Sequence, residues 1–145
     1  MKKNFDNLDL AWVAGIIDGE GYIGLFIANK KLKDGSIKGY PEVRVSVDNY
    51  DNQMVDKLYH MFGGSRFNRT VPDRRKIVQR WLVACKKAEN CLRLIEPYLV
   101  TKKKQAILAL ESRDWVNQCK TESIPFADRH PKDVWWVQEM KKLKI

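Results

Sequence analysis

The chain has 145 residues, of which 44% are apolar and 31% charged, and its formal net charge is +9 at pH 7. This length fits one domain, 1–145, whose apolar residues can fill a core without disulfides or a metal. The three cysteines are odd in number and lack CxxC spacing, which argues against a disulfide framework or a zinc ribbon. No apolar run approaches the ~20 residues that span a bilayer, so we expect an intracellular protein that is neither secreted nor membrane-bound.

The first segment of the chain predicts a helix followed by a β-hairpin. Asn7 or Asp9 can cap a helix whose apolar residues share one face and which must end at Gly19–Gly21. Residues 22–31 are compatible with an extended strand, and a turn then leads to valines that alternate with polar residues up to Val47. The second strand therefore has one apolar face and one polar face.

The middle of the chain predicts a second helix and a second hairpin. Asp51 can cap the helix, and the glycines Gly63–Gly64 are a carboxyl-terminal stop signal. Two extended segments follow, over 65–71 and 76–84, and Pro72–Asp73 between them is a turn signal.

The last third of the chain predicts helices. Residues 86–96 form one helix, which the following proline stops, and Thr101 can cap a longer one. The region 117–129 is polar and loop-like, and Pro131 is suited to the first turn of a final helix.

These elements predict an α+β fold in the order α-β-β-α-β-β-α, with extra carboxyl-terminal helices. The two hairpins can join into one antiparallel sheet covered by helices on one face. The other face would be open, polar and basic, and a β-ribbon of this kind fits the DNA major groove. The excess of Lys and Arg favours a polyanionic partner, because binding phosphates releases condensed counterions. Charge alone does not separate DNA from RNA or anionic lipid.

The stretch 13–21, VAGIIDGEG, places glycines and acids at the end of the first helix. Gly15 and Gly19 share one side of the helix, so a partner helix can approach closely there. Glu20 lies between two glycines, where an exposed carboxylate can hold a divalent cation. We expect Asp18 instead to accept backbone hydrogen bonds. The same stretch also fits an ordinary amphipathic helix that glycines end.

This stretch resembles the LAGLIDADG motif of homing endonucleases, from which it differs by apolar swaps, Gly19 for alanine and Glu20 for aspartate. Two further segments carry the resemblance: Val47–Asp51 at a strand-to-helix junction, and Pro97–Ala106, which is similar to the late lysine-glutamine segment of the family. The resemblance covers roughly Leu8–Leu110. It implies membership of the single-motif LAGLIDADG homing endonucleases.

The resemblance also implies roles for individual residues. Glu20 is expected to bind the catalytic Mg²⁺ or Mn²⁺, with the Gly19 carbonyl as a second ligand. Asn49 is expected to position water, and Lys102 to lie near the scissile phosphate. The adjacent Lys103–Lys104 compete with Lys102 for this role, and all three lysines fit simple phosphate contacts equally well.

A single copy of the motif implies a homodimer, because no second copy occurs in 22–145 and hydrolysis with two metal ions needs more than one carboxylate. Packing of two motif helices would bring both copies of Glu20 together. The expected interface residues are Trp12, Gly15, Ile16 and Gly19. The implied activity is site-specific cleavage of both strands of a long, roughly palindromic DNA target during intron homing.

For base reading we expect polar side chains on the open sheet face. The candidates are Lys30, Lys38, Arg44, Arg66, Arg69 and Arg80. Each of them fits a phosphate contact or a solvated charge equally well. The alternative function is a non-cleaving protein of the same fold, either an intron RNA maturase or a DNA-binding regulator. The sequence specifies neither the target nor the host.

Overall fold

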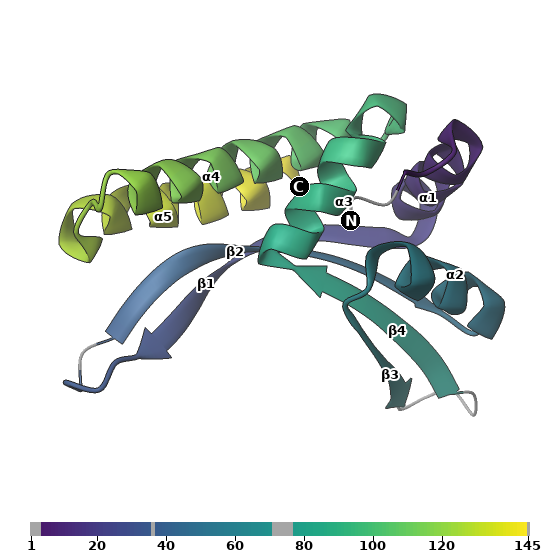
Figure 1. Cartoon of the computed structure of the whole chain (residues 1–145), viewed down its shortest axis with the longest axis horizontal. Coiled ribbons are helices and arrows are strands. Elements are labelled where there is room, and N and C mark those ends of the chain that lie inside the picture. Colours follow the sequence, from purple (N-terminus) through teal and green to yellow (C-terminus); the bar gives the residue numbers. More distant parts are fainter. Residues whose placement is uncertain (1–3, 36, 71–76, 145) are drawn as a thin grey trace.

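A computed structural model describes residues 4–35, 37–70 and 77–144. Figure 1 shows the helices gathered on one side of a sheet whose other side is open. In chain order the elements are α1 (Asn7–Glu20), β1 (Gly21–Lys31), β2 (Ile37–Asn49), α2 (Asn52–Phe62), β3 (Ser65–Thr70), β4 (Ile77–Ala84), α3 (Cys85–Ile95), a 3-10 turn η1 (Glu96–Tyr98), α4 (Lys103–Thr121) and α5 (Phe126–Leu143). The predicted α+β class and element order are confirmed.

The sheet joins the two hairpins through their second strands. The described strands are antiparallel and lie in the order β1-β2-β4-β3, with Val47 of β2 opposite Trp81 of β4 at the junction. In Figure 1 both hairpins slope away from the helices, so the open face of the sheet is concave. A concave ribbon surface of this kind can follow a convex partner.

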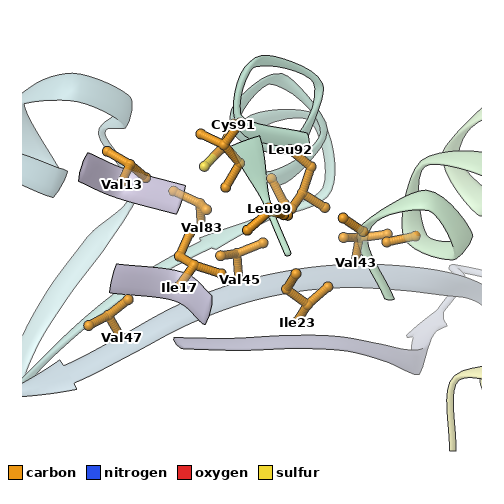
Figure 2. Close-up of a cluster of buried hydrophobic side chains, with 14 of the residues drawn as sticks. Val13, Ile17, Ile23, Val43, Val45, Val47, Val83, Cys91, Leu92 and Leu99 are labelled. Atoms are coloured by element: carbon orange, nitrogen blue, oxygen red, sulfur yellow. The ribbon is translucent and has the colours of Figure 1, made fainter. Parts of the chain in front are cut away.

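The core lies between the sheet and the helices. Val45 and Ile23 point from the sheet toward Ile17 of α1 and Leu92 of α3 (Figure 2), and all four side chains are fully buried. The alternation of valines in β2 therefore has the predicted cause: one face of the strand is buried and the other is not. Trp81 is also fully buried, as expected of a core residue, and the indole does not lie on the open face.

The residue that caps the beginning of α1 is not one of the two that the sequence predicts. The carboxylate of Asp6, rather than Asn7 or Asp9, accepts a hydrogen bond from the Leu8 amide at 2.8 Å. The helix continues through Glu20, so the glycine before it is helical. The predicted cap of α2 is confirmed, because Asp51 accepts from the Gln53 amide at 2.9 Å.

The carboxyl-terminal third departs further from the prediction. Most of the predicted loop 117–129 is helical, because α4 continues to Thr121 and α5 begins at Phe126. Pro131 lies inside α5 rather than in its first turn. A proline there removes one helical hydrogen bond, and burial of one side of the helix compensates. The buried residues of α5 are Arg129, Asp133, Trp136 and Met140.

Two smaller predictions have different outcomes. Thr101 does not cap the long helix; α4 begins at Lys103, and the residue at its cap position is Lys102, whose side chain makes no capping hydrogen bond. The predicted turn at Pro72–Asp73 lies outside the described residues.

Candidate active site

Glu20 is the last residue of α1, and its exposed carboxylate is held by a side chain from β2. The Nδ2 of Asn49 donates to Oε2 of Glu20 at 2.6 Å. Asn49 is fixed in turn, because its Oδ1 accepts from the Asp51 amide at 2.8 Å. The chain of hydrogen bonds joins the end of α1 to the β2–α2 junction and orients the carboxylate at the edge of the open face.

Asp18 and Lys102 join the same end of α1 to the start of α4. The two carboxylate oxygens of Asp18 accept from the amides of Val100 and Lys102 at 2.8 and 2.9 Å. The Nζ of Lys102 donates to the Asp18 carbonyl at 2.7 Å, at the helix end where the dipole is negative. The prediction that Asp18 accepts backbone hydrogen bonds is confirmed. Lys102 thus places its positive charge next to the turn that carries Glu20.

Part of one face of α1 is left uncovered by the described residues of the protomer. A Cβ added at Gly15 or Gly19 would meet no atom within 4 Å, and Leu8 is 79% exposed. At Gly21 the same Cβ would lie 2.6 Å from the Cα of Ile17. Close packing inside the protomer therefore explains why a glycine is needed at Gly21, but it does not explain the glycines at Gly15 and Gly19.

Trp12 and Ile16, the other predicted interface residues, are partly buried at the border of this open face. The Nζ of Lys57 lies 4.5 Å from the centre of the Trp12 ring and forms an ion pair with Asp9 at 2.8 Å. The indole therefore already has a partner within the protomer.

A hollow of about 340 Å³ lies on the open face, and Glu20 is one of its lining residues. Its other lining residues are Tyr22, Phe26, Arg44, Ser46, Asp48, Arg80 and Leu82. Asp48 accepts two hydrogen bonds from Arg80, at 2.6 and 2.8 Å, and one from Arg69 at 3.0 Å. The bonds from Arg80 in particular lower the pKa of Asp48 below its usual value. The hollow therefore combines the candidate metal ligand with ordered guanidinium groups.

Arg44 is ordered in a similar way. Its guanidinium forms an ion pair with Glu42 at 3.1 Å and lies 4.6 Å from the centre of the Phe26 ring. Three of the predicted base-reading residues, Arg44, Arg69 and Arg80, thus lie on the face that carries the hollow. The alternation in the sequence predicts the polar face of β2, whereas the ion pair between Asp48 and Arg80 depends on the pairing of β2 with β4.

Arg66 does not lie on the open face, and that part of the prediction is wrong. It pairs with the buried Trp81 across β3 and β4, so its side chain is on the helix-covered side. There it forms an ion pair with Asp56 of α2 and lies 5.7 Å from the centre of the Tyr59 ring. The side chains of two further candidates, Lys30 and Lys38, lie outside the described part of the structure, although their backbones pair in the β1–β2 ladder.

The residues that could hold a metal are few in one protomer. Across 4–35, 37–70 and 77–144, no three His, Cys, Asp or Glu side chains gather as a metal site. The end of α1 offers the Glu20 carboxylate and the carbonyl of Gly19, which belongs to the last helical turn. Both are oxygen donors suited to Mg²⁺, which needs additional ligands from water, DNA or a second protomer.

No protein-family model matches the chain, and no curated protein matches it. Solved structures do. The homing endonuclease I-CvuI in complex with its target has a TM-score of 0.70 and 20% identity, over 94% of this chain and 82% of that chain. The archaeal intron-encoded homing endonuclease I-Vdi141I complexed with DNA has a TM-score of 0.69 and 17% identity, over 94% and 84%.

The chain has the LAGLIDADG homing endonuclease fold. A third structure with this fold, the LAGLIDADG homing endonuclease I-LtrWI bound to target DNA, has a TM-score of 0.64 and 18% identity. That match covers 97% of this chain but only 45% of I-LtrWI. Among the described residues, no helix has the length and apolar composition needed to cross a membrane.

Proposed function

We propose that this chain is a single-motif LAGLIDADG homing endonuclease that cuts both strands of a specific DNA target as a divalent-metal-dependent homodimer. The observation that carries the proposal is the placement of Glu20. Its carboxylate is exposed at the end of α1, is held by Asn49 at 2.6 Å and borders the hollow of a concave, arginine-bearing sheet. Similar structures in complex with DNA support the same partner.

The homodimer follows from what one protomer offers. A single Glu20 carboxylate is too little for an active site with two metal ions. The open face of α1, with Gly15 and Gly19, can accept a second α1 across a two-fold axis, which would bring the two copies of Glu20 together. The match covers 82% of the I-CvuI chain but less than half of the I-LtrWI chain. These two values fit a fold that can occur once or twice in one chain.

We assign the divalent ion to Glu20 and the Gly19 carbonyl, and Mg²⁺ or Mn²⁺ fits these oxygen donors. When bound, such an ion activates water and stabilises charge on the leaving oxygen. Asn49 keeps the carboxylate in one orientation, and Lys102 adds a positive charge for the DNA phosphate. The homing endonuclease I-CvuI was crystallised with DNA in the presence of Ca or Mg, which supports this choice of ions.

DNA recognition is assigned to the concave sheet face. Arg44, Arg69 and Arg80 are held there by carboxylates, so their guanidinium groups are ordered before DNA arrives. Lys30 and Lys38 extend this assignment along the β1–β2 hairpin. A two-fold dimer would present two such faces, and we therefore propose a target of two similar half-sites in inverted order.

The test is cleavage by the wild-type chain and by Glu20→Gln, after selection of a target from a randomised duplex library with Mg²⁺. We expect the variant to bind the selected target with the same salt dependence and to lose cleavage by at least about a hundredfold, because the amide is a poor metal ligand. Glu111→Gln on the exposed side of α4 is the matched control and should cleave normally.

Equal cleavage by Glu20→Gln and the wild type would refute the active-site assignment. A wild-type chain that binds DNA or intron RNA with no cleavage under any divalent metal would instead favour the non-cleaving alternative. Sedimentation of the DNA complex tests the dimer, since a monomer on a complete cleavable site contradicts it.

A further inference from the structure

A second hollow, of about 650 Å³, lies beside the edge of β2 and shares no lining residue with the one at Glu20. Strand β2 pairs with β4 only from Arg44 to Asn49, so the earlier part of β2 borders this space with α3, α4 and the start of α5. The lining residues are Leu32, Tyr40, Cys85, Lys86, Glu89, Arg113, Val116, Asn117, Lys120 and Arg129.

The lining carries an excess of positive charge. It contains four cationic side chains, Lys86, Arg113, Lys120 and Arg129, and one acid, Glu89. The acid is already engaged, because its Oε1 accepts from the Arg113 Nε at 2.9 Å. Arg129 forms an ion pair with Asp133, a buried residue behind the lining, so Lys86 and Lys120 carry the charge that these two pairs leave unbalanced.

Arg129 is the most informative of these cations, because it is 92% buried and only partly satisfied. Its Nη2 donates to the Gly39 carbonyl at 3.1 Å, and its Nε lies 3.6 Å from the Asp133 carboxylate, too far for a hydrogen bond. The Nε has no hydrogen-bond partner among the described residues. Because this Nε is buried and faces Asp133, it does not donate into the hollow, and Arg129 instead adds a partly neutralised positive charge to the wall.

The amino terminus of α3 borders the same hollow. Its cap residue, Ala84, makes no side-chain hydrogen bond, and the first two helical residues, Cys85 and Lys86, line the hollow. The first amides of a helix lack partners within it and attract anions. Burial and the nearby carboxylate of Glu42 raise the pKa of the Cys85 thiol, and the positive charges of Arg113 and Lys120 act in the opposite direction. The helix end and the cations therefore face one small region.

We propose that this hollow binds the phosphate group of a nucleotide-sized small molecule. The phosphate would lie against the first turn of α3, between Lys86, Lys120 and Arg129, while Leu32 and Tyr40 would contact the rest of the ligand. A volume of about 650 Å³ is within the range of small-molecule sites. This site is separate from the proposed active site and does not depend on DNA cleavage.

Cys85 is a built-in reporter for the test, because it lines the hollow while Cys91 and Cys119 are buried. The full chain is alkylated with N-ethylmaleimide, and modification of each cysteine is followed by peptide mass spectrometry. Adenosine monophosphate should slow the alkylation of Cys85 saturably, by about fivefold or more, and inorganic phosphate should do so at higher concentration. The Lys86→Ala/Lys120→Ala variant should need about ten times more nucleotide.

The matched control, Lys87→Ala/Lys141→Ala, removes the same charge from exposed positions outside the hollow and should behave as the wild type. Thermal unfolding checks that both variants fold. The proposal is overturned if millimolar nucleotide leaves Cys85 alkylation unchanged, or if both double variants lose protection equally. It is also overturned if duplex DNA or RNA protects Cys85 while adenosine monophosphate does not, since the site would then hold a nucleic-acid backbone.

Discussion

One face of α1 is buried, whereas much of the opposite face is left uncovered by the part of the protomer that the structure describes. Val13, Ala14 and Ile17 on the first face have no exposed surface. On the second face, side chains added at Gly15 or Gly19 would enter open space. One helix can therefore serve two kinds of contact: its buried face stabilises the protomer, and its open face is the one proposed to pack on a second copy.

Ile17→Ala should have the largest effect on the stability of the protomer, because it empties a fully buried position. We expect a loss of about 2–5 kcal/mol in the free energy of unfolding, measured with urea. Leu8 on the opposite face is 79% exposed, so Leu8→Ala is the control and should change this free energy by about 0.5 kcal/mol or less at protein concentrations that keep the chain monomeric. Similar losses for both variants would contradict the assignment of the two faces.

Asp18→Asn should have an intermediate effect, because the carboxylate accepts from the amides of Val100 and Lys102. The asparagine keeps one acceptor oxygen and loses the charge, so about 1–2 kcal/mol of unfolding free energy should disappear. Asp18→Ala should cost more than Asp18→Asn. If denaturant titrations place both variants at the wild-type value, these bonds do not stabilise the fold.

Gly19→Leu should change the stability of the protomer least. A Cβ at this position meets no described atom within 4 Å, and leucine has the better helix propensity, so we expect a change within about 1 kcal/mol. Cleavage should nevertheless fall by at least about a hundredfold, because a bulky side chain would separate the two helices of the proposed dimer. Sedimentation and cleavage of the selected target measure the two effects.

Gly21→Ala is the counterpart of this substitution, because its Cβ would lie 2.6 Å from the Cα of Ile17. This variant should lower the unfolding free energy by about 1–3 kcal/mol. Together, Gly21→Ala and Gly19→Leu distinguish a glycine required for packing inside the protomer from a glycine required only for packing in the proposed dimer. Full cleavage and normal assembly of Gly19→Leu would show that α1 is not the dimer interface.

The sequence predicted local features well and long-range features poorly. The end of α1, the alternation in β2 and the cap at Asp51 depend on neighbouring residues, and each was found from its pattern. Arg66 was assigned to the wrong face because a shift of one residue reverses a strand, and the pairing with Trp81 fixes that register only in the folded sheet.

The prediction for the carboxyl-terminal helices is wrong for a related reason. The polar residues of 117–129 predict a loop. In the fold, however, Arg129 belongs to α5 and is buried, where it donates to the Gly39 carbonyl and lies near Asp133. The same cause hid the partners of the candidate site. Asn49 and Glu20 are 29 residues apart in the chain, and their hydrogen bond depends on how β2 meets α1.

The hydrogen bonds that Asp18 accepts from Val100 and Lys102 span 82 and 84 residues of sequence. A nascent chain on the ribosome therefore carries Glu20 early but cannot fix the helix end beside it until Lys102 has left the exit tunnel. Any catalytic capacity at this site would thus be withheld until the segment around Lys102 has emerged and folded against α1. For a protein proposed to cut DNA, that delay would confine cleavage to chains whose synthesis has passed the start of α4.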